Sequence, residues 1–328
     1  MQNKINIGIL GYGNLGKGVE ISISNNPDMN LVGVFSRREP KDVETIFNTT
    51  KTYKIDDLEK FKDKIDVLIL CGGSKDDLPI QAPRYVKDFN IIDSFDTHAK
   101  IPEYFNQIDK IAKENNTIGM ISIGWDPGMF SLNRLFGEVI LPVGETYTFW
   151  GKGLSQGHSD AIRRVDGVAD GVQYTIPSPQ AIEAVRSGIR PKLSTKDKHT
   201  RECYVVLKDG ADSKKVEHDI KTMPDYFEPY DTTVYFISQD ELNKNHNKMP
   251  HGGFVIRSGN SSEENNQVIE YAIKLDSNPE FTASVLVAYA RATYKMAKRR
   301  DFGAKTCLDV APALLSIKSP DTLRAELL

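Results

Sequence analysis

The clearest chemical signal in the chain is a glycine-rich turn, GYGNLG, at residues 11–16. It follows a short apolar run and opens a helical pattern, which is the setting that a dinucleotide-binding turn requires. The first glycine permits the tight turn, the second lets the backbone approach a pyrophosphate, and the third allows the helix to pack closely on the strand. The predicted dinucleotide contacts in this turn are Gly11, Gly13, Asn14, Leu15 and Gly16.

The residues that end the second predicted strand indicate which dinucleotide binds. An NAD-specific site carries an acid about twenty residues beyond the turn, where it accepts a hydrogen bond from the ribose 2′-hydroxyl. This chain has Ser36, Arg37 and Arg38 there instead. Guanidinium groups offer forked donors to phosphate oxygens, so the sequence favours NADP over NAD, although one of the two arginines fits equally well as solvated surface charge.

Two further polar loops end the fourth and fifth predicted strands. Their candidate cofactor and site residues are Gly72, Gly73 and Ser74 in one loop and Asp93, Ser94 and Asp96 in the other. Because the carboxyl ends of parallel strands meet at one edge of a sheet, we expect both loops to line the nicotinamide. Asp96 lies too far before the next predicted helix, near Pro102, to cap it, so the sequence favours a site role for its carboxylate.

The middle of the chain holds a second group of polar segments. In GWDPG, Asp126 precedes a proline, so its carboxylate either caps the following helix or points into a cleft between two domains, and Trp125 either packs or binds. The segment WGKGLSQGHSD at residues 150–160 is a turn whose backbone N–H groups suit a carboxylate. Arg201 begins a strand further on, and residues 249–253 and 278–279 add polar loops.

Other reaction classes find no support in the sequence. The six histidines are scattered and no paired cysteines have metal-ligand spacing, so a metal site is not expected. Ser155, His158 and Asp160 lie too close together in the chain for a hydrolytic triad. Hydride transfer, whose difficult chemistry the cofactor supplies, is the remaining reaction with positive support.

Length and composition exclude several classes of protein. The 328 residues predict about two domains. The 42 Lys and Arg against 45 Asp and Glu leave no basic excess for a phosphate backbone, so nucleic acid is not an expected partner. The apolar stretches are shorter than the roughly 18 residues that a membrane span needs, so no membrane partner is expected. Three scattered cysteines and no export signal predict a cytoplasmic protein.

The first half of the chain carries the pattern of an α/β domain. Short β-branched runs alternate with amphipathic stretches, which predicts a doubly wound parallel Rossmann-type sheet with helices on both faces. The predicted strands are residues 5–10, 30–35, 51–55, 65–71, 90–93 and 117–122, and the predicted helices are 15–25, 57–62, 79–89 and 102–115.

After residue 124, period-two alternation predicts an α+β domain on one open, largely antiparallel or mixed sheet of about six strands, with helices on one face. The predicted strands are residues 145–150, 171–176, 201–207, 231–237, 253–258 and 267–276, and the predicted helices are 129–140, 179–187, 213–221 and 280–299. The last helix is expected to return the chain to the first domain. We predict a dinucleotide-binding domain at 1–124, with about 300–328 packing back on it, and a substrate-binding domain at 125–299.

Several motifs in this order resemble the meso-diaminopimelate dehydrogenase family, namely GYGNLG, FSRR, DSFDTH, GWDPGMFSLNR, TFWGKGLSQGHSDAIRRV, VQYTIP, MPHGG and LDSNPEFTAS. The resemblance covers nearly the whole chain and is weakest at residues 42–54 and 260–266. It implies NADP-dependent, reversible oxidative deamination of the D-centre of meso-2,6-diaminopimelate in lysine and diaminopimelate biosynthesis. The products would be ammonia and L-2-amino-6-oxopimelate, which cyclises to tetrahydrodipicolinate. It also implies a homodimer formed by the second domain.

The resemblance also implies roles for individual residues. Asp96 and Asp126 match the acids that hold the reacting amino group beside the nicotinamide. The match around the reacting end comprises Trp125, Trp150, Gln156 and Gly157, and the match at the distal L-centre comprises Thr175, Arg201, His251 and Asn278. An ordinary Asp, with a pKa near 3.9, is a poor base for an ammonium group. We therefore expect the two acids to orient the amine, unless burial raises the pKa of one of them.

Two other functions stay open at this point. A two-domain NADP reductase for another substrate of the lysine and aspartate pathway, such as an aldehyde or a cyclic imine, would share the nucleotide domain. A non-catalytic redox sensor that binds NADP would use the glycines and arginines equally well. In that protein, however, the two acids, Trp150 and Arg201 would have no reason to converge.

Overall fold

The computed structural model describes residues 4–328, which form two compact units. Unit 1 comprises the chain up to Leu132 together with Pro279–Leu328, and unit 2 comprises Asn133–Asn278. Unit 2 is therefore an insertion between two parts of unit 1. Within residues 4–328, no helix has both the length and the apolar character needed to cross a membrane.

Unit 1 is built on a parallel sheet of seven strands in the order β14-β6-β5-β4-β1-β2-β3. The strands are β1 (Ile5–Leu10), β2 (Met29–Ser36), β3 (Thr52–Lys54), β4 (Val67–Leu70), β5 (Ile91–Asp93), β6 (Ile118–Met120) and β14 (Gly303–Lys305). The strand order reverses between β1 and β4, which is where doubly wound sheets bind their ligands. The predicted Rossmann-type architecture is confirmed, and β14 adds an edge strand that the sequence pattern did not indicate.

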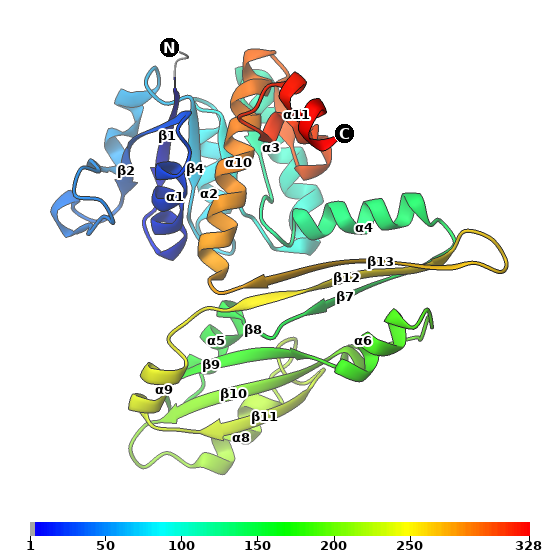
Figure 1. The fold of residues 1–328 in the computed structure, drawn as a ribbon. Coiled ribbons are helices and arrows are strands. Elements are labelled where there is room, and N and C mark those ends of the chain that lie inside the picture. Colours follow the sequence, from blue (N-terminus) through cyan, green and yellow to red (C-terminus); the bar gives the residue numbers. More distant parts are fainter. Residues whose placement is uncertain (1–3) are drawn as a thin grey trace. The chain divides into compact units, whose positions relative to one another are not determined.

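Helices cover both faces of this sheet (Figure 1). α1 (Asn14–Ser24) and α10 (Asn278–Lys298) pack against one face, and α2 (Leu78–Tyr85) and α3 (Ile101–Asn115) pack against the other. The shorter helical elements are η1 (Pro40–Asp42), η2 (Ile55–Phe61), η3 (His98–Lys100), η4 (Cys307–Asp309), η5 (Pro312–Leu315) and α11 (Pro320–Leu327). The helix predicted at residues 57–62 is the 3-10 helix η2.

The helix α10 belongs to the core of unit 1. A Cβ atom added to Gly18 of α1 would lie 2.9 Å from Cβ of Ala283, so a glycine is needed for the two helices to approach this closely. Further along α10, the buried Arg291 forms a two-pronged ion pair with Asp28, at 2.6 and 2.7 Å, and donates to the carbonyl oxygen of Leu315. These contacts place α10 with the first unit, whereas the predicted boundary after residue 299 had left it with the second.

Unit 2 contains two separate sheets, so the expectation of one sheet of about six strands is wrong. One sheet has the order β11-β10-β9-β8 and the other β13-β12-β7. The strands are β7 (Gly144–Trp150), β8 (Gly153–Leu154), β9 (Val168–Pro177), β10 (His199–Leu207), β11 (Asp231–Phe236), β12 (His251–Asn260) and β13 (Asn266–Leu275). The chain changes sheets at Gly151, whose φ of 111° and close approach to the Thr175 carbonyl suit glycine.

The pairing within these sheets is mixed, because β11 runs parallel to β10 while the other pairs are antiparallel. The helices that begin in or belong to this region are α4 (Met129–Ile140), α5 (Gln156–Arg163), α6 (Pro179–Arg186), α7 (Thr195–Lys198), α8 (Ser213–Lys221) and α9 (Gln239–Asn245). α5 and α8 pack on one face of the four-stranded sheet, α9 packs on the other, and α6 packs on the three-stranded sheet (Figure 1). The fold class, an α/β unit with a second α+β unit, is confirmed.

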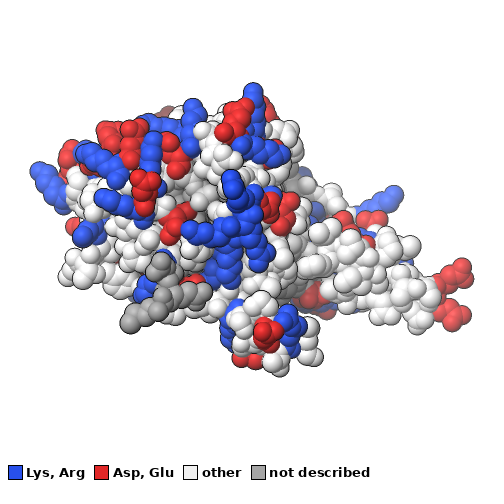
Figure 2. Space-filling model, turned by 90° about the horizontal axis from the view of Figure 1, so that it is seen from above, with Lys and Arg blue, Asp and Glu red and all other residues white. Residues whose placement is uncertain are grey.

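Charged side chains of both signs lie next to one another on the surface. Figure 2 shows acidic and basic side chains intermingled over the viewed face of the described residues. This agrees with the near balance of charges in the sequence, whose formal net charge is -3.

Candidate active site

The glycine-rich turn lies between β1 and α1 at the point where the strand order reverses. Gly11 has a φ of 92°, and a Cβ atom on Gly16 would overlap the carbonyl oxygen of Gly11. Packing within the protein therefore explains these two glycines. A Cβ atom on Gly13, by contrast, would meet no protein atom within 4 Å. Gly13 is the N-cap of α1 and carries no capping side chain, so this open helix end suits a pyrophosphate.

Of the two predicted phosphate-binding arginines, Arg38 contacts this turn. Arg38 donates to the carbonyl oxygen of Tyr12 in the turn at 2.5 Å, and its own N–H donates to Oγ of Ser36 at 3.1 Å. Arg37 forms an ion pair with Asp77 at 3.1 Å, but the Arg37 side chain is 73% exposed. An exposed pair of this kind contributes about 1 kcal/mol or less, so a phosphate group can compete for Arg37.

Ser74 joins the loops that follow β4 and β5. Its Oγ donates to the carbonyl oxygen of Ser94 at 3.4 Å and accepts from the backbone N–H of Asp96 at 3.0 Å. Asp96 itself is exposed. Beside them, the N–H of Gly73 donates to Asp77, whose side chain also fills the space next to Gly72. Sequence reasoning missed Asp77, although an acid at the N-cap of α2 is a recognisable local signal.

Asp93 fixes the end of β5. Its buried carboxylate accepts hydrogen bonds from the N–H groups of Phe95 and Ser122 and from the hydroxyl of Tyr104, at 3.0, 3.1 and 2.6 Å. Burial raises the pKa of the Asp93 carboxyl, while these donors oppose that rise. The side chain thus ties β5, β6 and α3 together, and its direct contact with a dinucleotide stays a prediction.

Trp125 and Asp126 occupy the tight turn before α4, in unit 1. Trp125 is buried and packs edge-on against Phe130, with ring centroids 5.3 Å apart. Asp126 is half-buried. The N–H of Gly128 donates to Oγ of Ser131, so a serine inside the helix takes part in closing this turn.

The centre of the candidate substrate site in unit 2 is Arg201. This side chain is 6% exposed, donates to the hydroxyl of Thr175 directly across the strand pair, and lies with its guanidinium carbon 3.8 Å from the Tyr230 ring centroid. Among residues 4–328 it has no carboxylate as ion-pair partner, and its Nε has no hydrogen-bond partner. A buried cation without a counter-charge is costly, so this arrangement suits an anionic ligand.

Thr175 adjoins Arg201 through backbone pairing, and His251 adjoins Thr175 through Gly153. Thr175 also pairs with Gly153 of β8, and the imidazole of His251 packs on Gly153, where a Cβ atom would lie 2.5 Å from its Cγ. Trp150 donates its backbone N–H to Nε2 of His199 at 2.8 Å, and the two rings stack. Thr175, Arg201, His251 and Trp150 are therefore linked within unit 2.

Sequence reasoning missed His199 and Tyr230, and also Gln173, whose side-chain amide donates to the Thr175 hydroxyl at 3.4 Å. Burial, together with the charge of Arg201, lowers the pKa of His199 to about 3, so its ring is neutral and accepts from Trp150. His199 precedes Arg201 by two residues and therefore faces the same side of β10, which is a signal that the sequence offered. Tyr230 lies in a distant loop, and no local pattern indicates it.

The loop at residues 249–251 brings the remaining candidates together. The backbone N–H of Asn278 donates to the carbonyl oxygen of Met249 at 2.9 Å, and Nε2 of Gln156 lies 3.2 Å from Sδ of Met249. Gln156 and Gly157 do not form an irregular turn, as the sequence predicted, but begin the helix α5, which Ser155 caps. The backbone N–H groups that we expected to face a carboxylate are thus those of a helix N-terminus.

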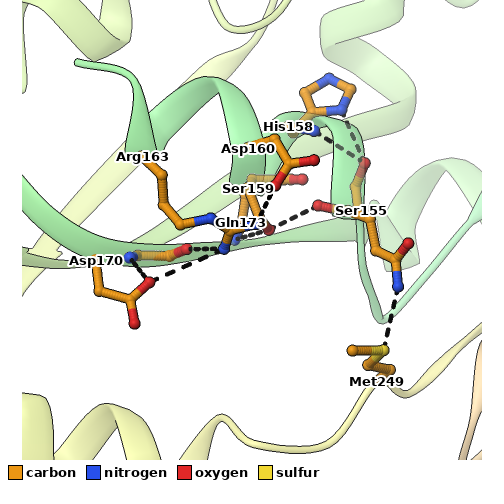
Figure 3. Close-up of polar contacts among 10 residues, drawn as sticks. Ser155, His158, Ser159, Asp160, Arg163, Asp170, Gln173 and Met249 are labelled. Carbon is orange, nitrogen blue, oxygen red and sulfur yellow. Dashed lines mark hydrogen bonds and ion pairs between the residues drawn. The ribbon is translucent and has the colours of Figure 1, made fainter. Parts of the chain in front are cut away.

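The contacts made by Ser155, His158 and Asp160 are structural and do not form a catalytic triad. Oγ of Ser155 contacts Nδ1 of His158 at 2.9 Å, whereas Asp160 pairs with Arg163 one turn further along α5 (Figure 3). In a hydrolytic triad the acid would orient the histidine. Here it does not, in agreement with the spacing argument from the sequence.

Comparisons with known proteins identify the family of this chain. A family model described as "Diaminopimelic acid dehydrogenase C-terminal domain" matches residues 124–277. A meso-diaminopimelate D-dehydrogenase from Ureibacillus thermosphaericus is 61% identical over 326 residues, which is 99% of this chain and 100% of the relative. The chain belongs to the meso-diaminopimelate dehydrogenase family. The resemblance seen in the motifs is thereby confirmed.

Solved structures of this dehydrogenase family match both units. A DAP dehydrogenase from Corynebacterium glutamicum, solved in complex with DAP, is 44% identical, with a TM-score of 0.92 and full coverage of both chains. An engineered D-amino acid dehydrogenase bound to NADP+ is 43% identical, with a TM-score of 0.88 over 99% of this chain and 100% of its own. Residues 124–277, which the family model matches, include Arg201 and the residues linked to it, namely Trp150, Thr175 and His251.

Proposed function

We propose that the protein catalyses the NADP-dependent, reversible oxidative deamination of the D-centre of meso-2,6-diaminopimelate. The products are ammonia and L-2-amino-6-oxopimelate, which cyclises to tetrahydrodipicolinate. Family membership and the DAP complex of the Corynebacterium glutamicum relative support this function. The observation that carries it in this chain is the buried guanidinium of Arg201, which lies beside Thr175 without a carboxylate partner among the described residues.

Unit 2 binds the distal L-centre in this proposal. Arg201 receives the distal carboxylate as a charge-assisted partner, and the Thr175 hydroxyl lies next to it. The further residues proposed for the distal centre are His251 and Asn278, and those for the reacting end are Trp125, Trp150, Gln156 and Gly157. Holding the distal centre determines which hydrogen of the reacting carbon is presented for transfer.

Unit 1 supplies the acids for the reacting end. Asp96 and Asp126 hold the reacting ammonium group and stabilise the positive charge of the iminium that forms on the substrate. The ammonium group first loses one proton to water, so that removal of a hydride from the D-centre leaves the iminium. NADP+, when bound, would supply the hydride acceptor. Water then attacks the iminium carbon, and ammonia leaves. The open N-cap at Gly13, Arg38 beside Tyr12 and the exposed Arg37 are proposed to hold the dinucleotide.

The function is tested by following NADP+ reduction with the meso, LL and DD isomers of diaminopimelate and with common D-amino acids. We expect rapid reduction with the meso isomer and little with the LL isomer, because only the meso and DD isomers contain a D-centre. In reverse, NADPH oxidation with tetrahydrodipicolinate must require ammonia. Oxidation without ammonia would instead indicate a reductase for a cyclic imine.

The choice of NADP is tested by the Arg37→Ala/Arg38→Ala double variant. Each lost charge-assisted contact with the 2′-phosphate weakens binding about tenfold, so we expect the Kd of NADP+ to rise about a hundredfold. The Kd of NAD+, which lacks this phosphate, should change by less than about threefold. Isothermal titration measures both constants, and Lys60→Ala, which removes an exposed cation paired with Asp57, is the control. Equal weakening of both dinucleotides would contradict the assignment.

We further propose that the protein is a homodimer formed through unit 2. Apolar side chains on and after α4 are strongly exposed, including Val139 at 63%, Ile140 at 62% and Val143 at 66%. On β13, Val268 and Ile269 are also exposed. Apolar patches of this kind are typical of protein interfaces, and a second copy of the same surface fits them. The molar mass in solution tests the proposal. A cytoplasmic location stays a prediction.

A further inference from the structure

One buried acid in unit 1 has no part in the reaction described above. Glu20 of α1 is 1% exposed, and its carboxylate accepts four hydrogen bonds. The donors are the hydroxyl of Tyr12, the hydroxyl of Thr50, the N–H of Ile46 at 3.0 Å and the N–H of Phe47 at 3.3 Å. An ionised carboxylate has about four acceptor positions, so these donors fill its capacity.

The four donors come from two segments that differ in character. Tyr12 is the second residue of the glycine-rich turn, and its ring is buried. Ile46, Phe47 and Thr50 belong to the segment 44–50, which joins η1 to β3 and is largely exposed. The N–H of Ile46 also lies 3.0 Å from the Tyr12 hydroxyl. Glu20 therefore holds an exposed segment against the turn that is proposed to bind the dinucleotide.

The same turn positions one of the proposed phosphate ligands. Tyr12 is held at two ends, because its hydroxyl donates to Glu20 while its carbonyl oxygen accepts from the guanidinium of Arg38. The segment 44–50 follows the arginine turn closely in the chain, and Thr52 beyond it donates to the carbonyl oxygen of Pro40 at 3.2 Å. A shift of Tyr12 therefore moves the carbonyl oxygen that the Arg38 guanidinium contacts, and the segment 44–50 is tied to Tyr12 through the N–H of Ile46.

We propose that Glu20 is a positioning residue for the 2′-phosphate site: by fixing Tyr12 and the segment 44–50, it sets the geometry of Arg38 and so favours NADP over NAD. This inference rests on the proposed use of NADP. Glu20 itself touches no ligand and acts through Tyr12.

The Glu20→Gln variant tests this role with little change in shape. The N–H groups of Ile46 and Phe47 donate to opposite oxygens of the carboxylate. Whichever way the glutamine amide is turned, its NH2 group must face one of these two N–H groups, and neither can accept a hydrogen bond. The hydroxyls of Tyr12 and Thr50 can reverse their roles, so the loss falls mainly on the segment 44–50.

We expect the Kd of NADP+ for Glu20→Gln, measured by isothermal titration without substrate, to rise about tenfold. The Kd of NAD+ should rise less than about threefold, and hydrogen exchange of residues 44–50 should accelerate. Tyr12→Phe, which removes the hydroxyl that links the turn to Glu20, should shift the ratio of the two constants in the same direction.

The control is Asp28→Asn, which breaks the ion pair with Arg291 in the same unit. It should lower the melting temperature while leaving the ratio of the two Kd values unchanged. An unchanged ratio of the two Kd values in Glu20→Gln would overturn the inference, whether both dinucleotides bind as before or both bind equally more weakly. Failure of the wild-type protein to bind NADP+ would instead overturn the proposed function, so the two failures are distinguishable.

Discussion

Replacing Arg201 by methionine should lower kcat/KM for meso-diaminopimelate by about thirtyfold to a few thousandfold, because truncating one partner of a buried charge pair costs about 2–5 kcal/mol. The unliganded variant should nevertheless keep or gain thermal stability. In the free protein this guanidinium is buried without a carboxylate partner among the described residues, and burial lowers its pKa. Methionine fills similar space without that cost. Steady-state kinetics and thermal unfolding of the same preparation measure both effects.

The matched control for this experiment is Arg186→Met, also in unit 2. Arg186 forms ion pairs with Glu183 and Glu270 at the surface, at 2.6 and 2.7 Å. This variant should lose a little stability and keep wild-type kinetics. A clear loss of stability in Arg201→Met with unchanged kcat/KM would mean that Arg201 is a structural residue, and the substrate assignment would then be wrong.

The second large effect is expected at Asp126. Asp126→Asn keeps the shape of the side chain but removes the negative charge that is proposed to face the ammonium and the iminium. We expect kcat to fall by about a hundredfold or more, as for other groups that stabilise charge developing in the transition state. The Kd of NADP+ should not change. Single-turnover measurements of NADP+ reduction separate this chemical effect from product release.

Asp88→Asn serves as the control in unit 1, since Asp88 forms a surface pair with Lys62 at 2.8 Å. It should leave kcat and dinucleotide binding as they are. If Asp126→Asn also retained wild-type kcat, Asp126 would have no role in holding the amine. Asp96→Asn, examined in parallel, shows which of the two acids carries more of the effect.

The parts of the fold that the sequence predicts well depend on local signals. The turn at residues 11–16 is recognisable because Gly11 adopts a positive φ and because the carbonyl group of Gly11 fills the space beside Gly16, only five residues away. The central strands β1 and β4 are mostly apolar and buried because both of their faces are covered, and α3 and α8 show a clear helical period. These features survive in any tertiary context that buries them.

The parts that the sequence did not predict depend on contacts between distant segments. The strand β14 has three residues and is defined by its pairing with β6, far away in the chain. The division of unit 2 into two sheets follows from where β7 and β8 find their partners, which alternation alone does not specify. In the site, Arg201 is recognisable as a candidate, but the ring of Tyr230 beside it comes from a separate loop.

The insertion of unit 2 within unit 1 determines the order in which the protein can be completed during translation. The ribosome finishes residues 133–278 before it makes α10 and β14, so unit 2 is synthesised in full while unit 1 still lacks a helix and an edge strand. Domains generally fold as units during synthesis. The nascent amino-terminal segment therefore keeps part of one sheet face uncovered until Ala283, Leu286 and Ala290, all fully buried in the finished protein, have emerged. Premature termination after residue 278 would spare the inserted unit and leave the nucleotide-binding unit without its last core helix.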